Sequence, residues 1–273
     1  MFSIITVNYN NASGLKRTIQ SVINQTLSDI EYIVIDGASN DDSLAVIEKY
    51  NEDISYWVSE SDNGIYHAMN KGIKVSKGQY LLFLNSGDIL KSKYILESIQ
   101  KKIKDNYDIY YGDLVFKSDL NTCIKKYPDE LDFSFFLKES LPHPATFIKR
   151  TLFETLFYYS ENFKIVSDWE FFIYAVCKEN VKYKYLGEII SVFELDGISN
   201  DPANKKLITE EREQVLQKYF KAFIDNAYRI EKQNEILQQS SVQMVIDINN
   251  HKWPRRILSI FVEFLHAIFV KKL

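Results

Sequence analysis

Over residues 2–104, short apolar segments rich in β-forming residues alternate with segments whose apolar residues recur at helical spacing. The expected strands are residues 2–9, 31–35, 54–59 and 80–84, and the expected helices include residues 65–74 and 94–104. Ser13 is a suitable N-cap for an earlier helix between the first two strands. This alternation predicts an α/β fold with a Rossmann-like, mainly parallel central sheet flanked by helices.

Polar clusters follow three of the expected strands. They are residues 8–10, 36–41 and 85–88. Because the carboxyl ends of parallel strands meet at one edge of a sheet, these clusters are expected to line a single crevice. The sequence therefore predicts a ligand site at that edge.

The composition limits the class of protein. The 273 residues include 33 basic and 37 acidic side chains, and this slightly acidic balance argues against binding to a nucleic-acid backbone. Cys123 and Cys177 show no metal-ligand spacing, so we expect reduced thiols and a cytoplasmic protein. Residues 1–6 lack the basic start of a signal peptide, and no apolar run reaches the ~20 residues that span a bilayer.

The sequence pattern changes twice in the later part of the chain. Residues 109–193 mix short strands with helices, whereas residues 205–243 are rich in Glu, Lys and Gln and keep helical spacing. The second segment is expected to form a long helix or a helix pair that packs on the first domain or on a second subunit. The expected domains are residues 1–200, a helical extension over 201–250, and a C-terminal amphipathic helix over 251–273.

Three segments together resemble glycosyltransferase family 2. They are residues 3–10 (SIITVNYN), residues 34–41 (VIDGASND) and residues 59–88, which contain SESDNGIY, MNKG and FLNSGD. The likeness extends more thinly to residues 143–149 and 167–170, and it is similar in particular to bacterial enzymes that build colanic acid and O-antigen. The resemblance implies a GT-A fold and the inverting transfer of a hexose or N-acetylhexosamine. The implied donor is a nucleotide-diphosphate sugar, by family habit UDP-linked, and the implied acceptor is a saccharide on polyprenyl diphosphate.

In this family an Asp-x-Asp motif after the fourth strand holds Mg²⁺ or Mn²⁺ against the diphosphate. Here the segment reads Asn-Ser-Gly-Asp, so an amide replaces the first acid. The resemblance implies that Asp88 is a metal ligand and that Asn85 binds the metal or the ribose. An ordinary turn is the alternative for this segment. His143, which lies between two prolines, is expected to bind metal or acceptor or to be a structural turn residue.

The resemblance also implies a donor pocket. The carboxylate of Asp36 would bind the nucleoside, and a turn residue beside Gly37 is the alternative. The other expected donor contacts are Thr6, Val7 and Tyr9 at the base, and Asp62 and Lys71 near the phosphates. Half-buried packing is the alternative for Tyr9, and a solvated surface charge is the alternative for Lys71.

An inverting transfer needs one group that accepts the proton of the attacking hydroxyl. The family places an acid before an aromatic helix in the second half, which implies Asp168 as the base, with Glu170 in reserve. Trp169 would then offer an apolar platform to the acceptor sugar. The alternative is that Asp168 only begins a helix, because acids favour helix starts.

The last residues combine apolar and basic side chains. Residues 257–270 are largely apolar, with Arg255 and Arg256 before them and two lysines, 271 and 272, after them. Ser259, Glu263 and His266 share one helical face, so the segment is expected to lie in the plane of an anionic membrane. This predicts a peripheral location on the inner face of the cell membrane, and the alternative is a helix buried between two copies of the chain.

Two other functions remain open from the sequence. A nucleotidyltransferase would normally carry a Gly-rich, basic loop after the first strand, and residues 8–12 read Asn-Tyr-Asn-Asn-Ala instead. A non-catalytic binding or assembly subunit is the other alternative, because the Asp-x-Asp motif is weakened.

Overall fold

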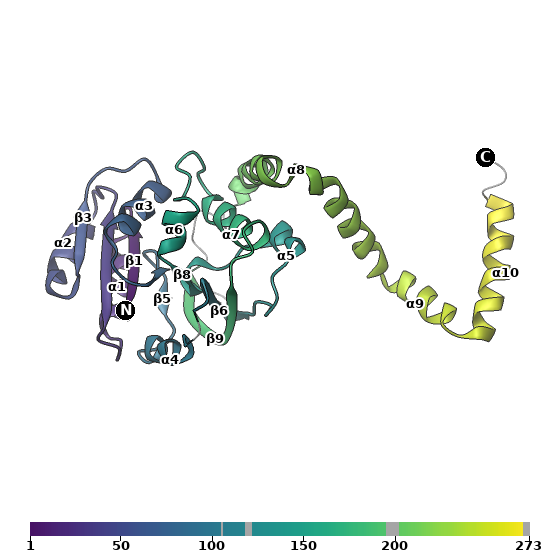
Figure 1. Ribbon diagram of the computed structural model, residues 1–273, viewed down its shortest axis with the longest axis horizontal. Helices are drawn as coiled ribbons and strands as arrows, with labels where there is room; N and C mark the ends of the chain where they lie inside the picture. The colour runs from purple at the N-terminus through teal and green to yellow at the C-terminus, as the bar shows by residue number, and fades with distance from the viewer. Residues whose placement is uncertain (105, 118–121, 195–201, 270–273) are drawn as a thin grey trace. The chain divides into compact units, whose positions relative to one another are not determined.

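The structure is a computed structural model that describes residues 1–104, 106–117, 122–194 and 202–269. The chain divides into two compact units, Met1–Tyr219 and Phe220–Leu273. The first unit contains the sheet, and the second consists of helices (Figure 1).

Within the described residues, the first unit forms one nine-stranded sheet in the order β3-β2-β1-β4-β8-β6-β9-β5, with β7 paired to β6. The strands are β1 (Phe2–Asn8), β2 (Ile30–Asp36), β3 (Tyr56–Ser59), β4 (Tyr80–Phe83), β5 (Ile89–Leu90), β6 (Ile109–Lys117), β7 (Thr122–Lys125), β8 (Thr146–Lys149) and β9 (Tyr183–Glu194). The helices are α1 (Ala12–Ile23), α2 (Ser43–Lys49), α3 (Ile65–Val75), α4 (Ile95–Lys102), α5 (Phe133–Lys138), α6 (Thr151–Thr155), α7 (Ser167–Cys177) and the start of α8 (Lys205–Leu237), with short 3₁₀ turns at η1 (Asn51–Asp53), η2 (His143–Ala145) and η4 (Pro202–Asn204).

The first four strands are parallel, as the alternating pattern predicted. β1 is buried along its whole length between β2 and β4, which explains its nearly continuous apolar sequence. Asn8 pairs with Asp36, and Asp36 pairs with Ser59, so three strands end at the same level. The chain after β4 continues beside β1, because Ser86 donates its backbone N–H to the carbonyl of Val7 at 3.1 Å. The polar segments after these strands therefore share one edge.

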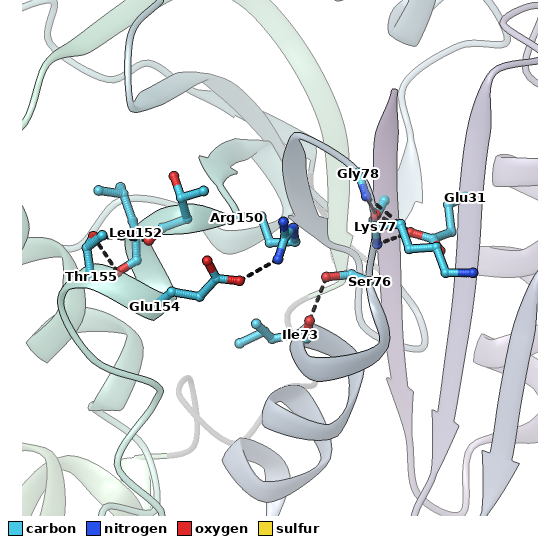
Figure 2. A network of polar contacts seen from close by, with 11 residues as sticks. Glu31, Ile73, Ser76, Lys77, Gly78, Arg150, Leu152, Glu154 and Thr155 are labelled. Atoms are coloured by element: carbon cyan, nitrogen blue, oxygen red, sulfur yellow. Dashed lines mark hydrogen bonds and ion pairs between the residues drawn. The ribbon is translucent and has the colours of Figure 1, made fainter.

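Helix α3 lies close against β1 and β2. A Cβ atom at Gly72 would come within 2.5 Å of Ile5 Cγ2, so only glycine permits this approach. After the helix, the backbone N–H groups of Lys77 and Gly78 donate to the carboxylate of Glu31, at 2.7 and 3.3 Å (Figure 2). These bonds fix the turn that starts β4 beside β1.

The second half of the sheet is mixed. β8 is antiparallel to β4 and β6, whereas β9 is parallel to β6 and antiparallel to β5. Aromatic side chains fill the space beneath α6 and α7, where the rings of Phe153 and Phe171 stack at 4.6 Å. The fold is therefore a mixed α/β fold, parallel in its first half and α+β in its second.

The second unit contains the remainder of α8, then α9 (Ser240–Asn249) and α10 (Lys252–Phe269). Helix α8 has a non-helical residue at Phe220, so the expected segment over 205–243 forms more than one straight helix. The expected C-terminal helix corresponds to α10, and residues 270–273 of that expectation lie outside the described residues. In the part of the chain that the structure describes, no helix is both long and apolar enough to cross a membrane.

Candidate functional site

Asp36 ends β2 and holds together the loops that follow three strands. Its buried carboxylate accepts hydrogen bonds from the amide of Asn8 at 2.7 Å, the hydroxyl of Ser59 at 2.7 Å, and the backbone N–H and hydroxyl of Ser39 at 3.0 and 2.6 Å. Burial raises the pKa of Asp36, but these hydrogen bonds outweigh it and leave the pKa below its ordinary value. A carboxylate accepts about four hydrogen bonds, so this one is filled by protein donors. In this structure Asp36 therefore holds together the ends of β1 and β3 and the loop after β2.

Beside it, Gly37, Tyr9 and Asp62 lie against one another. A Cβ atom at Gly37 would lie 2.8 Å from Asp62 Oδ2 and 3.3 Å from Tyr9 Cδ2. Tyr9 is 67% exposed, so its ring is open to a flat ligand, and Asp62 lies in the turn before α3. Thr6 and Val7 are buried below, and the Thr6 hydroxyl donates to the carbonyl of Leu84 at 2.7 Å.

Lys71 lies on α3 near the same loop. Its ammonium group forms an ion pair with Glu60 at 2.9 Å and donates to the carbonyl of Ser61 at 3.2 Å. The side chain is 17% exposed, so its charge is close to the edge and is already balanced by an acid.

The segment Asn85–Asp88 forms a tight turn after β4. Gly87 has a φ of 110°, and the backbone N–H of Asp88 donates to the carbonyl of Asn85 at 3.0 Å. Thr18 on α1 fixes the turn from below, because its hydroxyl lies 2.8 Å from the carbonyl oxygen of Asp88. The turn that was the alternative for this segment is present, and a metal-binding role for Asn85 and Asp88 stays a prediction.

This turn carries an unsatisfied oxygen. Among the described residues, the buried Oδ1 of Asn85 has no hydrogen-bond donor, and the side chain of Asp88 is 4% exposed. A buried acceptor without a partner is costly, and amide and carboxylate oxygens are ligands that suit a hard divalent cation. No group of three His, Cys, Asp or Glu side chains gathers within the described ranges as it would around a metal. The residues present therefore fit a cation that takes few protein ligands and obtains the others from phosphate and water.

Asp168 lies in the first turn of α7 and faces two other elements. The hydroxyl of Tyr66, on α3, is 2.7 Å from Oδ1 of Asp168, and Nδ1 of His143 is 3.8 Å from Oδ2. The carboxylate remains 23% exposed, so a ligand can reach it. The arrangement gives a held but accessible carboxylate, which is what a proton acceptor needs.

His143 is packed among aromatic rings and lies behind Asp168. Its ring is 5.0 Å from the ring of Phe83 on β4, and its Nε2 is 2.8 Å from the hydroxyl of Tyr159. Burial lowers the pKa of His143, and the attraction of Asp168 opposes this only in part. The imidazole is therefore neutral at neutral pH. Its Nδ1 lies toward Asp168 and its Nε2 toward Tyr159.

The two residues after Asp168 face inward. Trp169 is 2% exposed, donates its indole N–H to the carbonyl of Phe136 at 2.7 Å, and has the guanidinium of Arg212 4.8 Å from its ring centre. Glu170 is 1% exposed and accepts from Lys218 at 3.1 Å and Tyr219 at 3.0 Å. Both side chains are far less exposed than that of Asp168. In this structure Trp169 is not open to a sugar ring, and Glu170 is not open to an acceptor hydroxyl.

The expected residues form two groups, one at the ends of β1, β2 and β4 and one around Asp168. Asp36 ends β2 and Asn85 follows β4, and only β1 lies between these two strands, a spacing of about 10 Å. Phe83, two residues before Asn85, packs on His143 and so connects this edge to the Asp168 group. Sequence reasoning missed Tyr66 and Tyr159 as partners of the acid and its histidine, although Tyr66 lies within the quoted segment SESDNGIY.

Comparisons with known proteins show the family and the fold of this chain. The family described as glycosyl transferase family 2 matches residues 3–167. A PGL/p-HBAD biosynthesis glycosyltransferase of Mycobacterium tuberculosis is 28% identical over 214 residues, which cover 76% of this chain and 82% of the relative. An uncharacterized glycosyltransferase of the same organism is 34% identical over 185 residues, which cover 64% of this chain and 70% of the relative.

Two solved structures share the fold at low sequence identity. Staphylococcus aureus TarS 1-349 in complex with UDP-GlcNAc has a TM-score of 0.59 at 19% identity, and the match covers 71% of this chain and 58% of TarS 1-349. The mannosyltransferase PcManGT of Pyrobaculum calidifontis, solved with GDP-Man and Mn²⁺, has a TM-score of 0.55 at 13% identity and matches 99% of this chain and 87% of that protein. With the family match covering more than half of its length, this chain is a glycosyltransferase of family 2 with the GT-A fold.

Proposed function

We propose that this enzyme transfers a hexose or N-acetylhexosamine, with inversion, from a nucleotide-diphosphate sugar to a saccharide carried on polyprenyl diphosphate. The product would enter a bacterial surface polysaccharide. The observation that carries the proposal is an open tyrosine ring and an unsatisfied amide oxygen at one sheet edge, together with the partly exposed carboxylate of Asp168, whose partner His143 packs on Phe83 of β4.

The donor would lie over the Tyr9, Gly37 and Asp62 surface. The exposed ring of Tyr9 suits stacking with a base, and the carboxylate of Asp62 suits a ribose hydroxyl or a base N–H. A uracil base is proposed, and the UDP-GlcNAc bound by TarS supports it. Asp36 would act indirectly, by holding the loops that shape this surface.

The diphosphate would lie against the Asn85–Asp88 turn, with Mg²⁺ or Mn²⁺ held by Asp88 and by Oδ1 of Asn85. When bound, the cation supplies Lewis-acid stabilisation of the leaving diphosphate. Because residue 85 is an amide, this site has one negative charge fewer than a site with two carboxylates, as in an Asp-x-Asp motif. The Mn²⁺ in the PcManGT complex supports the choice of metal.

The acceptor would approach Asp168. As the acceptor hydroxyl attacks the anomeric carbon, the bond to the nucleotide diphosphate breaks, and Asp168 accepts the hydroxyl proton. Tyr66 orients the carboxylate by its hydrogen bond, and neutral His143 lies behind it.

The exposed side chains of α10 suit a membrane surface. Ile257, Ile260 and Phe261 are each more than half exposed, and Arg255 and Arg256 lie exposed at the start of the same helix. Exposed apolar side chains together with cationic ones support binding to an anionic membrane surface. We propose that the enzyme binds in this way at the inner face of the cell membrane.

A donor panel tests the proposal. Thermal shift with UDP-, GDP- and dTDP-sugars should single out one donor, because binding adds RT ln(1 + [L]/Kd) to stability. That donor should be hydrolysed slowly with Mn²⁺ and not after the change Asp88→Ala. If no donor raised the melting temperature or turned over, a non-catalytic assembly subunit would replace this proposal, and a nucleoside triphosphate as the preferred ligand would indicate a nucleotidyltransferase.

A further inference from the structure

The first turns of α8 contact the segment that carries Asp168, although they follow the region matched by the family. The carboxylate of Glu211 accepts hydrogen bonds from three consecutive backbone N–H groups, those of Lys164 at 2.8 Å, Ile165 at 3.1 Å and Val166 at 3.2 Å. Glu211 is 4% exposed. These residues immediately precede α7.

The same short loop is held from its other side. The carbonyl of Ile165 accepts from the hydroxyl of Tyr66, which also reaches Asp168, and the carbonyl of Val166 accepts the first helical N–H of α7, from Glu170, at 2.8 Å. The loop is thus fixed between α8 and α3. Because Asp168 comes two residues after Val166, the position of its carboxylate depends on this loop.

Arg212, the next residue of α8, contacts the same turn. Its guanidinium lies over the ring of Trp169, 4.8 Å from the ring centre, and it is attracted electrostatically to Asp168. Glu211 therefore holds the backbone before Asp168, and Arg212 covers the residue after it.

Apolar residues would be enough to pack this part of α8 against its neighbours, and Val215 and Leu216 are buried there. Burying a carboxylate is expensive unless hydrogen bonds compensate, and here three backbone donors of one loop provide them. A buried carboxylate at this position therefore indicates that Glu211 determines the conformation of the loop over residues 164–166.

We propose that Glu211 is a positioning residue, which sets the place of the Asp168 carboxylate through residues 164–166. The inference rests on the proposed function, in which Asp168 is the base. It extends the catalytic unit to the start of α8, which follows the region matched by the family.

The test compares Glu211→Ala and Glu211→Gln with Glu213→Ala, which removes an exposed carboxylate from the same helix. A misplacement of about 1 Å can cost on the order of 10²-fold in rate, so Glu211→Ala should lower kcat by that order and leave the donor Kd within about twofold. The variant Glu211→Gln keeps one acceptor oxygen, so its kcat should lie between those of Glu211→Ala and the wild type. Hydrogen exchange should become faster at the amides of residues 164–166 in Glu211→Ala and stay unchanged in Glu213→Ala.

A double-mutant cycle separates positioning from a general loss of structure. If Glu211 acts through Asp168, the change Glu211→Ala should cost little further activity in an Asp168→Asn enzyme. An equal loss of kcat in both backgrounds, or a kcat within twofold of wild type in Glu211→Ala, would overturn this inference and leave the proposed function intact. A wild-type enzyme that transfers no sugar would instead overturn the proposed function, and the positioning role with it.

Discussion

The hydroxyl of Tyr66 lies 2.7 Å from Oδ1 of Asp168 and connects the first turn of α3 to the first turn of α7. The two residues are 102 positions apart in the chain. Burial, reinforced by the negative charge of Asp168, raises the pKa of Tyr66 well above its ordinary value. The phenol therefore stays protonated at neutral pH, and its single proton is shared between the carboxylate of Asp168 and the carbonyl of Ile165.

The change Tyr66→Phe removes this donor and keeps the ring. We expect kcat to fall by about tenfold, with the donor KM unchanged, because the carboxylate loses the hydrogen bond that orients it. The free energy of unfolding should fall by about 1 kcal/mol for the lost bond. Tyr94→Phe, at a residue that is 56% exposed, is the matched control and should change neither quantity. A normal kcat in Tyr66→Phe would show that Asp168 needs no orientation from α3.

Stability should depend on pH through His143. Burial lowers the pKa of His143 in the folded state, so on acidification the unfolded chain takes up this proton first. Stability from this group is full above the unfolded pKa of about 6.5 and declines as the pH falls below it, by at most about 1.4 kcal/mol per pH unit.

Urea unfolding at pH 7, 6 and 5 measures this slope. His143→Gln should be less stable than wild type at pH 7, since it loses the contact with Tyr159, but its stability should fall less between pH 7 and pH 5. His251→Gln, at an exposed residue, should keep the wild-type slope. The same slope in His143→Gln and wild type would contradict the buried neutral imidazole.

The sheet edge could be predicted from the sequence because local patterns determine it. The strands that end at Asn8, Asp36 and Ser59 were expected to end within one residue of these positions, since their apolar runs stop there. The polar residues that follow were expected to share an edge, and the strand register agrees with that expectation.

What the sequence could not predict depends on pairings between distant segments. Ser13 was the expected N-cap of α1, but Asn11 accepts the capping bond from Gly14, at 3.0 Å, and its amide also donates to the carbonyl of Ser86. That second contact joins residues 75 positions apart, and no local pattern contains it. The burial of Trp169 under Arg212 has the same origin, because it depends on where α8 packs.

Donor binding should be sensitive to a methyl group at Gly37. The change Gly37→Ala places a Cβ 2.8 Å from Asp62 Oδ2, so Asp62 must move away from the surface that it forms with Tyr9. We expect the donor Kd to rise by about tenfold, or ~1.4 kcal/mol, by isothermal titration calorimetry. In an Asp62→Ala background the added methyl should cost little further affinity, because the displaced carboxylate is absent. Additive losses would show that the methyl group does not act through Asp62, and an unchanged donor Kd in both single variants would exclude this surface as the nucleoside site.

Metal affinity should respond to charge at residue 85. Asn85→Asp converts the unsatisfied amide oxygen into a carboxylate beside Asp88, so the Mn²⁺ concentration for half-maximal activity should fall, by about tenfold for ~1.4 kcal/mol. Asp88→Asn should raise it. Asn106→Asp adds the same charge at an exposed residue and should have no effect. Calorimetry of Mn²⁺ binding in the presence of UDP gives the same comparison without turnover. Unchanged metal dependence in Asn85→Asp would exclude this turn as the cation site.

Membrane binding should depend on both the apolar and the basic side chains of α10. Ile260 and Phe261 are 69% and 56% exposed, and Phe261 also lines an apolar groove with Ile248 of α9. In sedimentation with vesicles containing phosphatidylglycerol, the full chain should bind, and it should bind far less to vesicles of phosphatidylcholine alone. The change Phe261→Glu should abolish binding, because it places a charge where the apolar face would enter the lipid.

The basic residues provide the sharper measurement. Replacing Arg255 and Arg256 by Gln removes two charges worth about 1 kcal/mol each near an anionic surface, so affinity should fall roughly 30-fold at low salt. The difference should shrink as salt is added, because screening reduces the contribution of surface charges. Ser259→Ala, on the polar face of the helix, should bind like wild type. A different set of results would identify the α10 surface as an interface between two copies of the chain. These are a dimer by light scattering, a monomer after the change Phe261→Glu, and no vesicle binding by either protein.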